Sequence, residues 1–562
     1  MTQSGPAQSI ESHISEFGTR LDFLGKYPLS RRVVVREASG LVRQINWVDN
    51  MLIGLACISI GPGWMWVFTW MPAFWPSANL FWSLTLGAIG CTFQGIMYVM
   101  MGTAMPRSGG DYTFISRIFK PMLGFMENWT LIIYACLVIG AVAPMMSNLM
   151  LFGGFWSFGV ITGNGALIDI ARWLLTPLPC FLITMASFIP AVLIMIFSLK
   201  ATLRIFQAAT IIGMISWGIV TVIFAVSSRE GFVMAFNNYL SPLGVTYQGV
   251  IDVAKSSGQT ISTDFWKVAS DTLGGMFYTF FMYYGYYIGA FYAGELKEAG
   301  KSLLYGTMGA LWWAWAAYVI PIPFIAKTIG IDFMSYVGYM FYFNPTGWAA
   351  NIPPYPQFFA SLLYPNPLLV FIIWFGSAAW VLSLELSYWM FISRCMFAWS
   401  FDRVMPEKLA YVSSKYHTPA VTIIVATLIS IVGVYLSLYT GALIFSNMAI
   451  NMSFCWLIAT IVAIAFPRLK PDIYKASPRV VRWKVGPIPG ISILGVITSG
   501  ILIFVIWGAI QYPGVGGYVS WKTFAFVLSL FFAGGIVYLI SKYVRKRQGI
   551  DIGLAFSEIP PE

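Results

Sequence analysis

Long apolar runs separated by short polar segments are the dominant pattern of this sequence. An α-helix needs about 20 mostly apolar residues to cross the hydrocarbon core of a bilayer, and most runs have that length. The pattern therefore predicts an all-α polytopic membrane protein with twelve transmembrane helices. The predicted spans are residues 47–71, 81–104, 123–150, 174–198, 207–228, 270–296, 303–328, 367–396, 419–440, 443–466, 488–511 and 520–541.

The composition agrees with a chain that lies mostly in lipid. Hydrophobic residues make up 58% of the 562 residues and charged residues only 10%, whereas soluble domains carry about a quarter charged residues. The net charge of +11 does not indicate a nucleic-acid partner, because most basic residues lie between the apolar runs. We expect the lipid bilayer as a partner, no nucleic acid, and a monomer or a homodimer.

The basic residues predict the orientation of the spans. With the N-terminus inside the cell, 27 of the 33 Lys and Arg residues lie on the cytoplasmic side, either between spans or at the cytoplasmic end of one, and an excess of this kind sets topology. We therefore expect a multi-pass protein of the cell membrane with both termini in the cytoplasm. Of the two long exterior segments, 229–269 and 329–366, the second is rich in Pro, Asn and Gly and is expected to form a turn-rich cap.

Signals for a metal or a cofactor are weak. The only histidines are His13 and His417, and the six cysteines lie in or beside apolar runs without metal-ligand spacing. The sequence also lacks a Walker motif, so ATP is not expected to drive the protein. We expect no metal and no cofactor other than a coupling ion, H⁺ or Na⁺.

Two predicted spans are interrupted near their middle. Span 1 contains Ser59-Ile60-Gly61-Pro62-Gly63, where proline removes an amide donor, and span 6 contains Gly285 within a run of tyrosines. A tolerated kink is the simpler explanation for either one alone. Paired interruptions in the two halves of a transporter, however, mark its binding site. We predict breaks at Gly61–Gly63 and near Tyr284–Tyr286 that face each other, with half-helix N-termini for an anionic group and free carbonyls for a cation.

Glu385 lies well inside the predicted span 8. A carboxylate at this depth costs about 2.5–3.5 kcal/mol on insertion scales, so it must face protein or water rather than lipid. It either bonds to neighbouring Ser and Tyr hydroxyls as a structural group, or serves as a proton carrier or a counter-charge for a cationic substrate. We predict that it points into a central cavity, within reach of Ser383, Ser387 or the aromatic residues of span 6.

Short motifs also occur in a characteristic order. They are Pro106-Arg107-Ser108-Gly109-Gly110-Asp111-Tyr112, then Glu295-Leu296-Lys297, then Ser393-Arg394 with Phe401-Asp402-Arg403, and then Phe466-Pro467-Arg468. Their order and spacing resemble the amino acid–polyamine–organocation (APC) superfamily of transporters, from about Arg43 to the C-terminus. The resemblance implies a LeuT-type fold, in which two inverted halves of five helices are followed by two C-terminal helices.

On this resemblance the chain divides into four parts. They are a cytoplasmic N-terminal segment (1–44), a ten-helix core (45–466, with halves at about 45–228 and 268–466), a cytoplasmic loop with helices 11 and 12 (467–544), and a cytoplasmic tail (545–562). The substrate-binding residues that it implies are Ile60, Gly61, Gly63, Trp64, Phe281, Tyr284, Gly285 and Tyr388. The coupling candidates are Glu385, Ser383 and Ser387.

The chain departs from the family pattern at three places, and at one of them Glu298-Ala299 replaces the usual Asn-Pro. Pro62 lacks the amide that would donate to a substrate carboxylate, although Gly63 and Trp64 can still donate. Gly213 stands where some proton-coupled members have a lysine, so a lysine-based proton switch is not supported. The related fold also uses a basic–acidic latch on the cytoplasmic side, and we predict that Arg43 or Arg36 approaches Asp402.

The expected function is secondary active transport of an amino acid or a related amine by alternating access. Transport would be coupled to protons or sodium, or would exchange one substrate molecule for another. The alternative is a channel or a receptor-like membrane protein of similar helical architecture, although no pore-lining ring of charges is apparent. An enzyme is not expected, because no cluster of His, Cys and acidic residues lies near one face.

Overall fold

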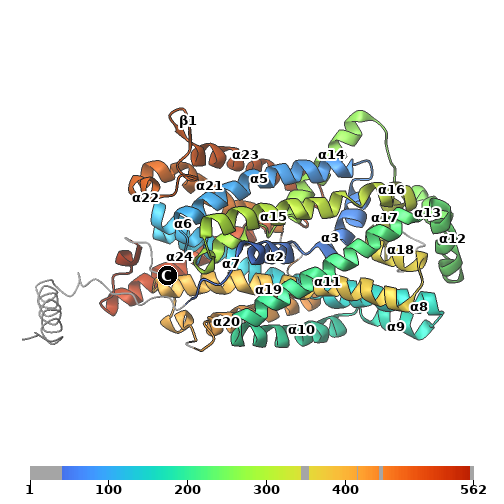
Figure 1. Ribbon diagram of the computed structural model, residues 1–562, viewed down its shortest axis with the longest axis horizontal. Helices are drawn as coiled ribbons and strands as arrows, with labels where there is room; N and C mark the ends of the chain where they lie inside the picture. Colours follow the sequence, from blue (N-terminus) through green and yellow to red (C-terminus); the bar gives the residue numbers. More distant parts are fainter. Residues whose placement is uncertain (1–40, 344–352, 414, 442, 444–446, 557–562) are drawn as a thin grey trace, which may run out of the picture.

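The structure is a computed structural model that describes residues 41–343, 353–413, 415–441, 443 and 447–556. Its helices run along the long axis of an elongated bundle (Figure 1). Within the described residues, ten helices are long and apolar enough to cross a membrane, and counting the bent pair Trp47–Ile58 and Ile60–Phe74 as one span gives eleven. The predicted all-α polytopic class is therefore confirmed.

The long helices follow the predicted spans closely. They are α5 (Leu80–Ala104), α7 (Pro121–Val142) with η3 (Met146–Leu151) and α8 (Phe152–Thr162), α10 (Pro177–Phe197), α11 (Leu199–Val226), α15 (Ala299–Val319) with α16 (Ile322–Thr328), α19 (Pro367–Phe401), α20 (Ala420–Tyr435) with η8 (Leu436–Thr440), α21 (Met448–Leu469), α23 (Gly490–Gln511) and α24 (Trp521–Arg547). Large apolar side chains such as Ile189 and Phe532 point outward from them. An apolar outer surface of this extent suits contact with lipid.

Shorter elements connect these helices. They are α6 (Asp111–Ile118), α9 (Gly165–Trp173), α12 (Arg229–Leu240), η4 (Ser241–Leu243), α13 (Tyr247–Ser256), α17 (Ile331–Phe343), α18 (Pro356–Leu363), η7 (Glu407–Ala410), α22 (Pro471–Ala476), η10 (Ile552–Phe556) and an antiparallel hairpin of β1 (Lys484–Val485) and β2 (Ile488–Pro489). The segment expected to be a turn-rich cap thus contains two helices, α17 and α18. The turn motif Asn344-Pro345-Thr346-Gly347 within it lies outside the described residues.

Side-chain caps begin many of the long helices. The side chains of Asn79, Ser198 and Asn366 accept amide hydrogen bonds at the starts of α5, α11 and α19. These caps satisfy amides that have no partner within the helix. α7 and α10 instead begin with a proline, whose missing N–H is not needed in a first turn. Local sequence therefore sets the helix starts.

The first predicted span is broken at Ser59. α2 (Trp47–Ile58) ends there, and α3 (Ile60–Met65) begins on the other side, continuing through η2 (Trp66–Trp70) and α4 (Met71–Phe74). Ser59 has a left-handed backbone with φ of 55°, and the two halves are bent by 43°. The prediction of a break is confirmed, but its position is Ser59 rather than Gly61–Gly63. Pro62 lies in the first turn of α3, where proline does not interrupt a helix.

The sixth predicted span is broken as expected. α14 (Phe265–Met282) ends before the tyrosine run, which continues as turns and as the short 3₁₀ helices η5 (Ile288–Phe291) and η6 (Ala293–Glu295). Gly285 has a φ of 123°, which an L side chain rarely adopts. Because this span is split, length and composition yield at most eleven spans in the described chain rather than the predicted twelve.

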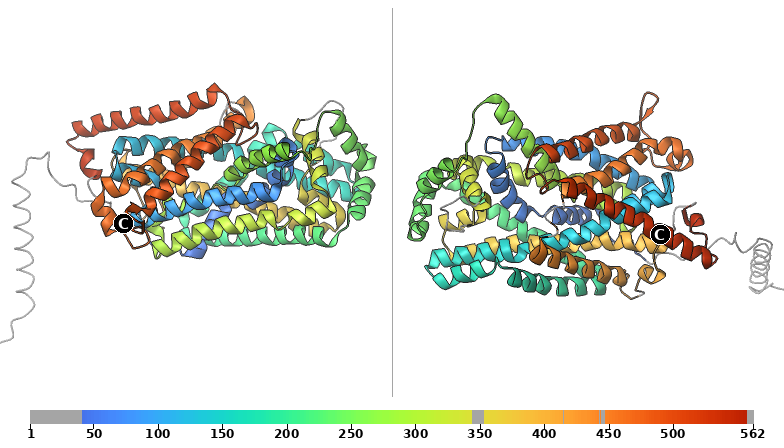
Figure 2. Two further views of the ribbon diagram at one scale, coloured as in Figure 1. Left: turned by 90° about the horizontal axis from the view of Figure 1, so that it is seen from above. Right: turned by 180° about the vertical axis from the view of Figure 1, so that it is seen from behind.

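The two ends of the bundle differ in their connections. We call one the terminal end: it carries the start of α2, the C-terminal ends of α19 and α24, and the β1–β2 hairpin. The other, the distal end, carries α9, α12, α13 and α17 (Figure 1). Figure 2 shows α24, in red, along one flank of the bundle, where it packs against α7.

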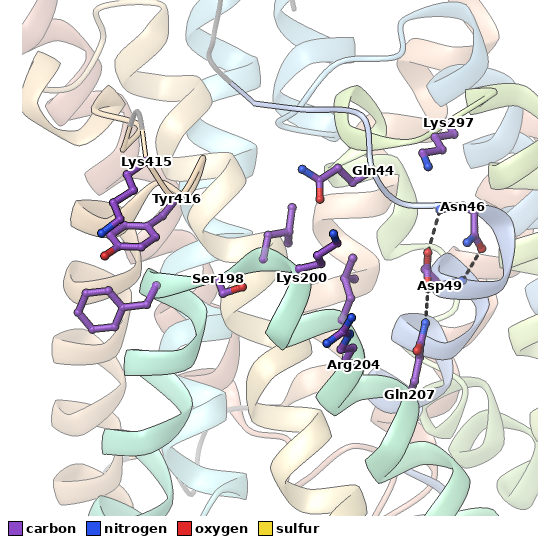
Figure 3. A pocket seen from close by; sticks show the side chains of 13 residues that line it. Gln44, Asn46, Asp49, Ser198, Lys200, Arg204, Gln207, Lys297, Lys415 and Tyr416 are labelled. Atoms are coloured by element: carbon purple, nitrogen blue, oxygen red, sulfur yellow. Dashed lines mark hydrogen bonds between the residues drawn. The ribbon is translucent and has the colours of Figure 1, made fainter.

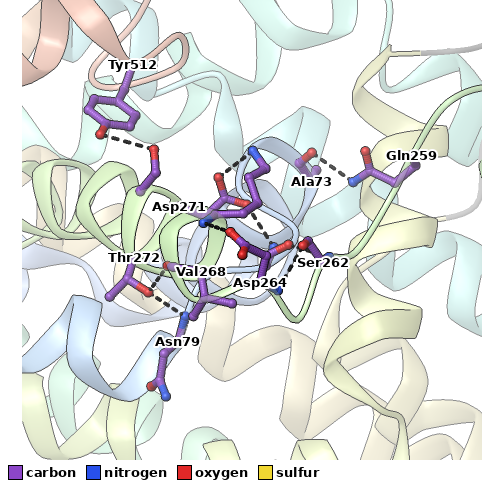
Figure 4. A network of polar contacts seen from close by, with 12 residues as sticks. Ala73, Asn79, Gln259, Ser262, Asp264, Val268, Asp271, Thr272 and Tyr512 are labelled. Carbon is purple, nitrogen blue, oxygen red and sulfur yellow. Dashed lines mark hydrogen bonds and ion pairs between the residues drawn. The ribbon is translucent and has the colours of Figure 1, made fainter.

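The distal end is held by a polar network between the α4–α5 connection and the start of α14. The Asp271 carboxylate accepts hydrogen bonds from the Ser77 amide at 3.0 Å and from the Lys267 ammonium at 2.8 Å. The Gln259 amide group donates to the Ala73 carbonyl nearby (Figure 4). These contacts join the end of α4 and the connection after it to α14 and the segment before it.

Candidate functional site

A small cavity lies between the two helix breaks. Its volume is about 50 Å³, and residues of α2, α3, η2, α7, α14, α19 and α21 line it together with the two break segments. The lining residues are Cys57, Ile58, Ser59, Pro62, Trp66, Val142, Phe281, Met282, Tyr284, Leu384, Tyr388 and Met448. None of these side chains is charged, so the cavity suits a ligand whose side chain is neutral and largely apolar.

The breaks face each other across this cavity. A Cβ atom added to Gly285 would lie 2.7 Å from Cys57 Cβ, so glycine is required for the close approach of the two segments. The amides of Tyr284 and Ile288 donate to the carbonyls of Phe281 and Gly285. The amides between them lie outside any helix, and a broken helix must turn such groups toward protein or a water-lined cavity. The predicted juxtaposition of the two breaks is therefore confirmed.

The start of α3 presents its backbone to the same region. Ser59 donates its hydroxyl to the Trp380 carbonyl at 3.3 Å, which fixes the break against α19. Beyond it, the helix from Ile60 runs to Phe74, so its N-terminal dipole end points at the cavity. The amide missing at Pro62 leaves fewer donors at this N-terminus than a non-proline residue would provide.

The sequence-predicted binding residues fall into two groups. Phe281, Tyr284 and Tyr388 line the central cavity. Ile60, Gly61 and Trp64 instead line a smaller cavity of about 10 Å³ on the other side of α3, against α11, α18 and α19. Gly63 packs on the Tyr318 hydroxyl, and Gly285 packs on Cys57. Ser59, Pro62 and Trp66 line the central cavity and were not predicted, because the break lies two residues before the expected place.

Gly213 has a clear packing role in the smaller cavity. A Cβ atom there would lie 2.2 Å from the Trp380 indole nitrogen. The indole thus occupies the space into which a longer side chain on α11 would extend. The structure gives a steric reason for glycine at this position.

Glu385 is fully buried, but its contact differs from the predicted one. It accepts a hydrogen bond of 3.1 Å from the Ser187 hydroxyl of α10, and its second oxygen has no partner among the described residues. Ser383 and Ser387 donate to carbonyls of their own helix. Because successive residues of a helix point about 100° apart, Leu384 and Tyr388 face the cavity while Glu385 faces α10.

The predicted latch partner Asp402 is buried at the terminal end. Its carboxylate forms an ion pair of 2.6 Å with Arg117 at the end of α6, and both side chains are about 2% exposed. Arg43 is exposed, and the structure does not bring it to Asp402. Arg36 lies outside the described residues. Among the described residues the basic partner of Asp402 is therefore on α6, and an approach of Arg36 to Asp402 stays a prediction.

A second buried ion pair at the terminal end was not predicted. Arg394 of α19 donates from Nε and Nη2 to the two oxygens of Glu295, at 2.7 and 3.0 Å. The Glu295 carbonyl accepts the amides of Gln44 and Ile45, and the Lys297 amide donates to the Ile45 carbonyl. Glu295 thus joins the segment before α2, the segment after the span 6 break, and α19. Both residues lie in motifs noted from the sequence, but nothing in those motifs indicates that they pair.

A basic groove opens at the terminal end beside the start of α2. Its volume is about 730 Å³, and its cationic side chains are Lys200, Arg204, Lys297 and Lys415 (Figure 3). At its inner side Asp49 accepts a hydrogen bond of 2.7 Å from the Gln207 side chain, which ties α2 to α11. In the described residues no group of three or more His, Cys, Asp or Glu gathers in a way that would hold a metal ion.

Comparison with known proteins gives concordant matches. A sequence model of amino acid permeases matches residues 60–551. The chain is 30% identical over 156 residues to the branched-chain amino acid permease BcaP of Bacillus subtilis (strain 168), covering 26% of this chain and 32% of that protein. It is 35% identical over 78 residues to the serine/threonine exchanger SteT of the same organism, covering 13% of this chain and 17% of that protein. The alignments therefore span about a third or less of these curated relatives.

Proposed function

Because the chain belongs to the amino acid permease family, we propose that it is a secondary carrier that moves amino acids across the cell membrane by alternating access. The observation that carries this proposal is the pair of broken helices that face each other around a closed cavity. In secondary transporters, discontinuous helices at corresponding positions of two repeats form the substrate site. A channel would instead need a continuous pore through the bundle.

The proposed architecture has twelve spans in a LeuT-type arrangement. α14 and the irregular segment up to Glu295 together form the sixth span, and the core halves at about 45–228 and 268–466 are inverted repeats. The terminal end faces the cytoplasm, which is supported by the basic groove and by the excess of Lys and Arg in the segments assigned to that side. The breaks at Ser59 and Gly285 then lie near the middle of the membrane.

The proposed substrate is a neutral amino acid with an apolar side chain. Phe281, Leu384 and Met448 offer apolar contacts, and the cavity lining has no charge to balance a charged side chain. The amino group is recognised by carbonyls freed at the end of α2, and the carboxylate by amides at the start of α3. At about 50 Å³ the cavity is closed tightly, so the substrate enters after one end of the bundle opens.

We also propose that transport is driven either by the gradient of a coupling ion or by exchange against a second substrate molecule. Glu385, Ser383 and Ser387 stay predicted coupling residues, and Glu385 would act through Ser187 and α10 rather than from the cavity lining. Replacement of Glu385 by Gln keeps the shape and removes the titratable proton. A variant with the wild-type rate and the same pH dependence of transport would show that Glu385 is structural.

Counterflow in liposomes tests the carrier proposal. Vesicles loaded with unlabelled leucine are diluted into labelled leucine, and a carrier gives a transient accumulation of label inside, because exchange is faster than net loss. We expect this overshoot from the wild-type protein and its loss in Tyr388→Ala. Phe371→Ala is the matched control, since it removes an outward-facing aromatic residue of the same helix. Equilibration of leucine and of other neutral amino acids without an overshoot would contradict a carrier.

A further inference from the structure

Two acidic side chains are fully buried on the terminal side of the cavity. Asp111 is the first residue of α6, and Glu127 lies on α7, against which α6 packs. The Tyr98 hydroxyl of α5 donates to one Asp111 oxygen at 2.9 Å. The other Asp111 oxygen and both oxygens of the Glu127 carboxylate have no hydrogen-bond partner among the described residues. A buried carboxylate without a hydrogen-bond partner needs an explanation, such as a bound proton, ion or water.

Among the described residues, no cationic side chain is paired with Asp111 or Glu127. The two buried arginines of the described chain, Arg117 and Arg394, are already paired with Asp402 and Glu295. The titratable groups that face the two carboxyls from the surrounding elements are Tyr98 of α5, Tyr287 after the span 6 break, Cys395 of α19 and Cys455 of α21. All of these are neutral when they carry their protons.

Two interacting carboxyl groups in such surroundings cannot both be ionised. Each buried charge is penalised by the loss of water, and two like charges near each other disfavour the doubly charged state further. The pair therefore holds at least one proton when the protein is closed. Burial raises the pKa of Asp111 from 3.8 to about 7, against the opposing effect of the Tyr98 hydrogen bond. A small change of hydration at this place is then enough to release or bind a proton near neutral pH.

Aromatic contacts connect this pair to the central cavity. Tyr284, which lines the cavity, packs on Trp456 with ring centroids 4.4 Å apart, and Tyr287 packs on the same indole at 4.9 Å. Tyr287 in turn packs on Tyr98 at 5.1 Å, and Tyr98 bonds to Asp111. A continuous series of four aromatic side chains thus leads from the cavity to Asp111.

The backbone just before Asp111 is bonded to the segment after the span 6 break. This segment has to move if the terminal end opens. The Gly109 amide donates to the Phe291 carbonyl at 2.9 Å, and Ser108 bridges to Tyr292, directly after the span 6 break. The same segment continues to Glu295, which closes the terminal end with Arg394. Separation of these contacts on opening would bring water to Asp111 and Glu127.

We propose that Asp111 and Glu127 form a proton-binding site that couples proton release to opening of the terminal end. The inference rests on the proposed carrier function and places the coupling proton away from Glu385. In the closed protein one carboxyl keeps its O–H bond. When the terminal end opens, that bond breaks, the proton passes to water on the cytoplasmic side, and the electron pair stays on the carboxylate oxygen. Closing again requires a proton to be taken up.

The experiment has one arm that needs no transport. Infrared difference spectra of the purified protein, taken while the pH is stepped across neutrality, report the C=O stretch of a protonated carboxyl group. We expect a titrating carboxyl band in the wild type that is lost or displaced in both Glu127→Gln and Asp111→Asn. Glu407→Gln, which changes an exposed carboxylate near the terminal end, should keep it. A wild-type spectrum without such a band, or a band unchanged in both variants, overturns the proposal.

The second arm uses leucine uptake into liposomes with an imposed pH gradient. We expect the wild type and Glu407→Gln to accumulate labelled leucine above the level reached without a gradient. Glu127→Gln should show counterflow of leucine at equal pH. With the pH gradient applied, it should accumulate no more labelled leucine than without the gradient. Gradient-driven accumulation at the wild-type level in both Glu127→Gln and Asp111→Asn overturns the proposal. Absence of counterflow in the wild type would instead contradict the carrier function, while the infrared result would still decide whether the pair binds a proton.

Discussion

Removal of the Glu295 carboxylate should both destabilise the protein and open its terminal end. Glu295 and Arg394 are at most 1% exposed, and two hydrogen bonds of 2.7 and 3.0 Å join them. Glu295→Ala leaves the Arg394 guanidinium buried without a counter-charge, which costs about 3–5 kcal/mol. If part of this cost is relieved when the terminal end opens and water reaches Arg394, each 1.4 kcal/mol raises the open population about tenfold.

Two measurements follow this effect. Thermal unfolding in detergent gives the loss of stability, and the rate of maleimide labelling at Cys57, read by mass spectrometry of its peptide, gives the opening of the cavity that Cys57 lines. Glu298→Ala is the control, since Glu298 is exposed and its contact with Lys301 spans 3.6 Å, so it should change stability by less than about 0.5 kcal/mol. The double variant Glu295→Leu/Arg394→Met should recover much of the stability. If Glu295→Ala matches Glu298→Ala in both measurements, the ion pair does not hold the terminal end.

Three further predictions follow. Gly285→Ala should lower stability by about 1–3 kcal/mol and abolish counterflow, because the φ of 123° at Gly285 and its approach to Cys57 exclude a Cβ atom. Gly500→Ala, which has open space around the added Cβ atom, should be neutral in the same two assays. The contribution of Asp111 to stability should fall as pH rises from 4 to above 7, because the pKa of Asp111 is about 7 when folded but 3.8 when unfolded, so the folded state binds more protons in this window. Asp111→Asn should flatten that slope in thermal unfolding. Tyr388→Ala should shift binding toward bulkier side chains in a thermal-shift panel of amino acids, and an unchanged order of ligands would place Tyr388 outside the site.

The sequence predicted the existence of both breaks, but the position of only one. Gly285 lies in a tyrosine run that offers no other residue for a left-handed turn, so the break falls where it was expected. In span 1 the break was predicted at the Gly61-Pro62-Gly63 motif, because glycine and proline often interrupt helices. The chain instead turns at Ser59, because proline is tolerated in the first turn of a helix. A proline marks a nearby helix boundary without fixing on which side of it the break lies.

Side-chain partners across the bundle could not be predicted in the same way. Glu295 pairs with a residue 99 positions away, and Arg117 with Asp402 at 285 positions. The cost of placing a carboxylate in lipid predicted that Glu385 is buried, and this is confirmed. Whether it faces the cavity or α10 depends on the rotation of α19 about its own axis, which the sequence does not show. Hydropathy and the cost of burying a charge predict that a side chain is buried. Which side chain it pairs with depends on which helices pack against one another.

The most direct test of the central claim is whether leucine protects Cys57 from maleimide. Cys57 lies at the end of α2 and lines the cavity between the two breaks, so a substrate bound there must cover its thiol. The account predicts that leucine, at concentrations that saturate counterflow, slows labelling of Cys57 in the wild type and has no such effect in Tyr388→Ala. Labelling at the same rate with and without saturating leucine would contradict a substrate site between the breaks.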